Sequence, residues 1–210
     1  MGPSKYLVSV LLAAAALSAA PAIVEKVRNE KVSVTTVVLQ PGESETVSGN
    51  LPGVTVYFQA GSMQVTRAGG KAAKAAVERG EALREVGGPR VIRNTGSGEL
   101  RYARVSFPGP GSAETWGMSG LSPHYQMIYE DRLARVYNIR IPAHTSEPQH
   151  THRDRVVICI SGAELKHIFP DGREEPSTLA TSEVAWRLGT THIGQNLGGT
   201  DLWVVAVEPK

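Results

Sequence analysis

The chain has 210 residues, of which 41% are hydrophobic, enough for the core of one ordinary domain or of two small ones. Its 22 Lys and Arg residues nearly balance its 20 Asp and Glu residues, giving a formal charge of +2 without a basic block. This charge pattern argues against a nucleic-acid-binding surface and favours a small-molecule ligand of low charge as the partner.

The N-terminal segment predicts export. Lys5 precedes a mostly apolar stretch from Tyr6 to Leu17, and small residues follow up to Ala22. This order is typical of a signal peptide. We therefore expect residues 1–22 to be a signal peptide and the protein to be periplasmic or secreted, with membrane contact only if the segment is retained as an anchor.

From Val32 onward, short runs rich in Val, Ile, Thr and Tyr alternate with Gly, Pro, Asn and Asp. This pattern, with turns at roughly eight-to-twelve-residue spacing, is typical of an all-β sandwich or barrel. The clearest expected strands are residues 32–39, 54–60, 101–107, 134–141, 155–160 and 201–207. Only Gly69 to Leu83, rich in Ala, Lys and Glu, predicts a helix or else a mobile excursion between strands.

An internal repeat becomes visible when the chain is shifted against itself by about 102 residues. "GEALREVGGPRVIRNTGSGELRYARV" then lies on "SEVAWRLGTTHIGQNLGGTDLWVVAV", pairing Gly87 with Gly189 and Asn94 with Asn196. The chain is therefore predicted to contain two copies of one small β unit, at residues 30–107 and 129–210. Residues 108–128, rich in Pro and Gly near their start, form the expected linker.

Three histidines form the candidate metal site. His150 and His152 precede the run "RVVICI", and on a strand their side chains face the same way. His192 follows in "RLGTTHIGQN" and can complete the site from a neighbouring strand. Imidazole nitrogen suits Zn, Fe, Ni, Cu and, with oxygen ligands, Mn. The first copy has approximately Ser48, Asn50 and Arg90 at these places, so such a site is expected only in the second copy.

The same stretches carry a family resemblance. "PAHTSEPQHTH" with "VVICISG", and "RLGTTHIGQN", resemble the two sequence motifs of the cupin superfamily, well over residues 130–208 and weakly over 32–107. The matched positions are His150, His152, Gly162, Gly189, His192 and Asn196. The resemblance implies two tandem cupin jelly-roll β-barrels, a bicupin with a degenerate first barrel and a small cupin-2-like second barrel. It also implies that a metal, where present, is held inside the barrel by three His and one Glu.

The chain departs from that family pattern at the glutamate. The family Glu is expected near residues 156 and 157, which are both Val, and one deletion puts Arg155 in its place. A cation there would repel a divalent ion, although three imidazoles alone can hold a catalytic metal. Asp154 or Glu147 could supply the missing oxygen, but each is more often a solvated charge. Arg155 is either an exposed hairpin charge or a ligand-binding cation in the pocket.

Three hypotheses follow for function. The first is an exported protein that binds a small molecule at a divalent Fe, Mn, Ni or Zn centre on the three histidines. If it is an enzyme, dioxygenase and isomerase are the first classes to test, with no catalytic residue assigned. The second is a metal-free module in which Arg155 and the histidines bind an acidic ligand. The third is a purely structural barrel that serves an oligomer or a cell-envelope complex. Edge strands could pair across subunits to give a homodimer, or the two barrels of one chain could satisfy each other.

Overall fold

The computed structural model describes residues 20–210, which contain β-strands and no helix. Residues 1–19 of the predicted signal peptide, which spans residues 1–22, lie outside the described residues. Within the described part, no helix is long and apolar enough to span a membrane. The expectation of an all-β chain is confirmed.

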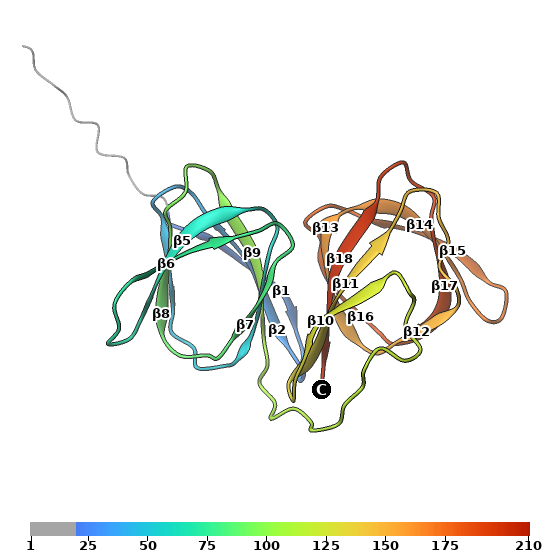
Figure 1. Cartoon of the computed structure of the whole chain (residues 1–210), viewed down its shortest axis with the longest axis horizontal. Coiled ribbons are helices and arrows are strands. Elements are labelled where there is room, and N and C mark those ends of the chain that lie inside the picture. Colours follow the sequence, from blue (N-terminus) through green and yellow to red (C-terminus); the bar gives the residue numbers. More distant parts are fainter. Residues whose placement is uncertain (1–19) are drawn as a thin grey trace, which may run out of the picture.

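The strands form two successive sets with the same topology (Figure 1). The first set, called the front barrel, comprises β1 (Ala22–Arg28), β2 (Ser33–Leu39), β3 (Ser44–Val47), β4 (Gly53–Tyr57), β5 (Gly61–Arg67), β6 (Ala73–Val77), β7 (Ala82–Glu85), β8 (Arg90–Asn94) and β9 (Leu100–Ser106). The second set, called the rear barrel, comprises β10 (Tyr125–Glu130), β11 (Ala134–Ile141), β12 (His150–His152), β13 (Arg155–Ser161), β14 (Ala163–Ile168), β15 (Glu174–Leu179), β16 (Val184–Arg187), β17 (Thr190–Asn196) and β18 (Leu202–Pro209).

Each barrel consists of a five-stranded and a four-stranded antiparallel sheet. The front sheets have the orders β1-β2-β9-β4-β7 and β3-β8-β5-β6, and the rear sheets have the orders β10-β11-β18-β13-β16 and β12-β17-β14-β15. The cross-strand pairs repeat as well, because Leu39 opposite Leu100 corresponds to Ile141 opposite Leu202. The internal repeat of the sequence is therefore a repeat of strand order and register.

The helix predicted within Gly69–Leu83 is wrong, because this stretch contains strands β6 and β7. Strand β6 lies at the edge of its sheet, where its backbone pairs with β5, and only Val77 of its side chains is buried. The exposed Ala and Lys residues favour a helix locally, but the ladder to β5 overrides that preference. Gly80 turns the chain between the strands with φ of 76°, and a Cβ there would meet the Trp203 ring at 2.0 Å.

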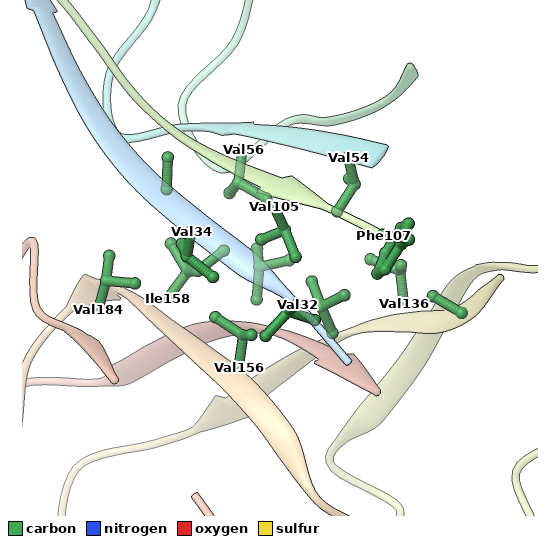
Figure 2. Close-up of a cluster of buried hydrophobic side chains, with 14 of the residues drawn as sticks. Val32, Val34, Val54, Val56, Val105, Phe107, Val136, Val156, Ile158 and Val184 are labelled. Atoms are coloured by element: carbon green, nitrogen blue, oxygen red, sulfur yellow. The ribbon is translucent and has the colours of Figure 1, made fainter. Parts of the chain in front are cut away.

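The two five-stranded sheets pack against each other and share one apolar core (Figure 2). Val54 and Val56 of β4 face Val156 and Ile158 of β13 across this interface. The opposite faces of these sheets line the separate barrel interiors, where Val157 and Cys159 are buried. Burial on both faces explains why "VTVYF", "VVICI" and "WVVAV" are nearly continuous apolar runs.

Candidate metal centre

The three predicted histidines lie together inside the rear barrel. His150 and His152 extend from β12, and His150 is the direct cross-strand partner of His192 on β17. All three side chains are buried, and one ring nitrogen of each lies within 4.8 Å of the others. The Nε2 atoms of His150 and His152 are 3.0 Å apart. The backbone pairing of two strands thus produces the convergence expected from the sequence.

Hydrogen bonds at the far side of two rings fix their tautomers. The Pro148 carbonyl, 2.8 Å from Nδ1 of His150, can only accept, so this nitrogen carries the proton. Nδ1 of His152 lies 3.4 Å from the Tyr137 hydroxyl, which donates its own proton to Glu208 at 2.8 Å. Both Nε2 atoms therefore direct lone pairs toward the centre, as a metal site requires.

The histidines are neutral at pH 7. Burial lowers the pKa of all three rings, and the charge of Arg155 lowers each of them further. The pKa of His192 falls to about 3. Neutral imidazole is the form that binds metals, so protons do not compete for these nitrogens near neutrality.

Tyr125 is a site residue that the sequence did not reveal. Its hydroxyl lies 2.9 Å from Nε2 of His150 and 3.2 Å from Nε2 of His152. The ring stacks on Tyr137 with centroids 5.5 Å apart. Tyr125 begins strand β10, within the stretch predicted as linker, so no alternation pattern indicated which way its side chain points.

The two candidate oxygen ligands have different surroundings. Asp154 lies outside the site, where it accepts a hydrogen bond from the Gly189 amide at 2.8 Å and pairs with Lys31 at 3.3 Å. Glu147 is buried, with Oε2 3.8 Å from Nε2 of His150. Its Oε1 has no hydrogen-bond partner among the described residues, and burial raises its pKa to about 7. Of the two, only Glu147 faces the histidines.

Arg155 is buried in the barrel interior and is not an exposed hairpin charge. It forms no ion pair within residues 20–210, and its guanidinium reaches only the carbonyls of Arg153 and Leu188, both at 3.4 Å. Its Nε has no partner among the described residues. Because a buried cation is normally paired, Arg155 is available for an anionic ligand.

His167 is a second site residue that sequence reasoning placed elsewhere, in a surface or core role. Its ring stacks on His192 with centroids 4.6 Å apart, and its buried Nδ1 lacks a partner among the described residues. A usable signal was present, because His167 shares strand parity with the buried Leu165 and so faces the barrel interior.

A cavity of about 60 Å³ lies beside the histidines, lined by Glu147, Arg155 and apolar side chains such as Leu165 and Val204. An outer pocket of about 260 Å³, which includes Phe169 and Arg187, shares Arg155, His167 and His192 with it. Arg155 therefore stands where the outer pocket meets the inner cavity, a position suited to orienting the acidic end of a small molecule.

The front barrel has no comparable group. In the rear barrel His150 lies opposite His192, and in the front barrel Val47 lies opposite Arg90. The front counterpart of His150 is therefore Val47, one residue before the predicted Ser48. Arg90 is buried and pairs with Glu85 at 3.2 Å. Within residues 20–210, the three histidines of the rear barrel are the one cluster of His, Cys, Asp or Glu with metal-ligand spacing.

Comparisons with solved structures identify the fold. A cupin 2 conserved barrel domain protein from Leptotrichia buccalis matches over 92% of this chain and 90% of its own, with 13% identity and a TM-score of 0.59. AerE from Microcystis aeruginosa matches over 90% and 98%, with 11% identity and a TM-score of 0.63. A variant of oxalate decarboxylase from Bacillus subtilis matches over 91% and 74%, with 13% identity and a TM-score of 0.65. No family model and no curated protein matches the sequence.

The chain is thus a cupin-fold protein. More specifically, it has the two-barrel arrangement of a bicupin, and the one buried three-histidine cluster within residues 20–210 lies in the rear barrel.

Proposed function

We propose that the rear barrel binds a divalent metal ion through His150, His152 and His192, and that this centre binds a small acidic molecule. The observation that carries the proposal is the pair of Nε2 lone pairs directed at each other across 3.0 Å. The Tyr125 hydroxyl can donate its single proton to only one of them. A metal ion between the rings would accept both Nε2 lone pairs, so these residues suit a metal ion.

The partners of the histidines suit this role. Pro148 orients one ring, and the chain from His152 through Tyr137 to Glu208 orients another. Glu208 is itself held by an ion pair with the buried Arg135. Such supporting bonds keep ligating rings in one tautomer and orientation.

The ligand is inferred from the rest of the cavity. Arg155 supplies an unpaired cation for a carboxylate, and Nδ1 of His167 supplies a further polar contact. The remaining lining is mostly apolar and the inner space is small. These features favour a compact molecule with one anionic group, anchored by Arg155 and presented to the metal.

A bound ion would supply Lewis acidity for an isomerase or redox chemistry for a dioxygenase, the two enzyme classes that we propose to test. The protein residues would bind and orient the substrate. Tyr125, within hydrogen-bond distance of two histidines, is the group best placed to exchange a proton with a substrate oxygen.

The proposal is tested by elemental analysis of protein purified without a His-tag. We expect near-stoichiometric iron, manganese, nickel or zinc that is lost in the His150→Ala, His152→Ala double variant. A thermal-shift screen of small mono- and dicarboxylates on metal-loaded protein then tests the ligand class. Oxalate is included because one structural neighbour is an oxalate decarboxylase.

A metal-free binding module is the second candidate, favoured by the unpaired guanidinium of Arg155. It predicts that protein free of metal, and unable to take up metal on reconstitution, still binds carboxylates. That result would replace the first proposal with the second.

A further inference from the structure

The two barrels carry a buried glutamate at equivalent positions. Glu45 is the cross-strand partner of Ile92 between β3 and β8. In the rear barrel, the backbone amide of Glu147 donates a hydrogen bond to the carbonyl of Gly194, and Ser146 forms an isolated antiparallel β-bridge with Gln195. Both pairings follow the same register, displaced by the repeat offset of about 102 residues. The front glutamate therefore serves as an internal reference for the rear one.

In the front barrel this glutamate is fully satisfied. Glu45 accepts two hydrogen bonds from the guanidinium of Arg104 and one from the hydroxyl of Tyr102. Both partners project from β9 into the same barrel. A buried carboxylate with a cation and a hydroxyl as partners is an ordinary structural feature.

In the rear barrel these partners are absent at the matching positions. The residues that correspond to Tyr102 and Arg104 are Val204 and Ala206, both apolar. Glu147 has no ion pair with Arg or Lys among the described residues. Burial raises its pKa and the hydroxyls of Ser122 and Tyr125 lower it, as does the charge of Arg155, but its Oε1 is without a partner there. Burying an ionised carboxylate without such a partner is costly, so Glu147 needs another cation close to it.

A glycine makes room for the carboxylate beside the histidines. A Cβ on Gly194 would lie 2.7 Å from Oε2 of Glu147, whereas the front barrel has Ile92 at this place. Gly194 follows His192 by two residues on β17, so the two face the same side of the strand. The missing side chain thus leaves the carboxylate free to lie over the strand that carries His192.

The separation of Glu147 from His150 is close to that of two ligands of one ion, but its carboxylate is not within 4.8 Å of all three histidine nitrogens, so ligation requires its side chain to turn toward His152 and His192. Ligand atoms about 2.0–2.2 Å from one tetrahedral metal are about 3.4 Å from each other. Oε2 of Glu147 lies 3.8 Å from Nε2 of His150, and the Nε2 atoms of His150 and His152 are 3.0 Å apart. A negative ligand also offsets the repulsion between a divalent ion and Arg155.

We propose that Glu147 is the fourth protein ligand of the metal, a carboxylate supplied from three residues before the His-x-His pair. Arg155 then occupies the place of the glutamate in the cupin motif and is released to bind an acidic ligand. This inference rests on the proposed function.

Titration with Mn²⁺ and with Zn²⁺ alone, on untagged protein stripped of metal, tests the proposal. Glu147→Gln should weaken Mn²⁺ binding at least about 10-fold, the scale seen when groups supporting a metal are removed. Zn²⁺ should lose less affinity, since imidazole suits zinc whereas carboxylate oxygen suits manganese. The thermal stabilisation caused by Mn²⁺ should fall in parallel.

Glu45→Gln is the matched control, because it removes an equally buried carboxylate from the barrel that lacks the histidines. It should lower thermal stability and leave the affinity for both ions unchanged. Glu147→Gln with wild-type affinity for both ions, alongside His152→Ala without binding, would overturn the ligand role of Glu147 and leave the proposed function intact. A wild-type protein that binds neither ion would overturn both.

Discussion

At the scale of single residues, the ionised carboxylate of Glu147 destabilises the protein when no cation is bound. Burial raises its pKa in the folded protein from the ordinary 4.5 to about 7. Below pH 4.5 the group is protonated in both the folded and the unfolded protein and costs no stability. As the pH rises from 4.5 through 7, the free energy of unfolding falls, because the buried group resists ionisation. A shift of this size corresponds to about 3 kcal/mol.

Glu147→Gln should consequently stabilise the metal-stripped protein at pH 8 by up to about 3 kcal/mol, because the ionised form no longer has to be buried. Near pH 4.5 the variant and the wild type should unfold alike. Urea unfolding at both pH values measures the difference. A variant less stable than wild type at pH 8 would indicate that Glu147 has a structural partner.

Arg155→Met separates ligand binding from metal binding. We expect the affinity for small carboxylates to fall at least about 10-fold, as is typical when a charge-assisted pair is lost, because no other unpaired buried cation lines the inner cavity. Metal affinity should be unchanged or higher, since a repulsive charge is removed.

Calorimetric titration of each ligand checks this prediction. Arg101→Met is the control, because Arg101 lies on β9 of the front barrel and already pairs with Glu99 at 3.0 Å. Equal loss of carboxylate binding in both variants would count against a specific role for Arg155.

At the scale of elements, the repeat unit is held by the same asparagine in both barrels. The side-chain amide of Asn94 donates to the carbonyls of Leu39 and Gly98, and that of Asn196 donates to those of Ile141 and Thr200. Each side-chain oxygen also accepts a bond from a following glycine amide. The repeat in the sequence pairs these two residues, and both hold the turn that follows their strand.

Asn94→Ala and Asn196→Ala should each cost about 2–3 kcal/mol, because three buried hydrogen bonds are lost in both cases. Urea unfolding of the two variants provides the measurement. A large cost at one position and none at the other would show that the barrels do not depend on equivalent bonds.

Strands with apolar alternation were predictable from the sequence, and so was the meeting of three histidines, because both follow from local periodicity and motif spacing. Tyr125 was not, since its strand lies in a stretch that lacks a clear pattern and is fixed by pairing with β11. Strand β6 was mistaken for a helix because its side chains are exposed and only its backbone pairing defines it. Long-range pairing of this kind leaves little local signal.

At the scale of the whole molecule, the two barrels depend on one shared core. Side chains from both five-stranded sheets form a single buried cluster (Figure 2). Arg79 of the front barrel also donates to the carbonyl of Ile160, and Arg84 pairs with Asp131 at 2.8 Å. If the two sheets separated, each would expose a large apolar surface to water, and the hydrophobic stabilisation from burying it would be lost.

We therefore expect the barrels to unfold together. Val156→Asp, which places a charge in the shared core, should lower the stability of the whole chain by at least about 3 kcal/mol in one transition. Val86→Asp, at an exposed position, should have little effect. Calorimetry that resolves two transitions, only one of them shifted by Val156→Asp, would show that the barrels are independent.

Anomalous diffraction from crystals of the metal-loaded, untagged protein would show whether a metal ion is bound in the rear barrel and in that barrel alone. We predict one strong peak between the Nε2 atoms of His150 and His152, within bonding distance of His192, and none inside the front barrel. A peak elsewhere, or none in protein shown to contain the metal, would contradict this prediction.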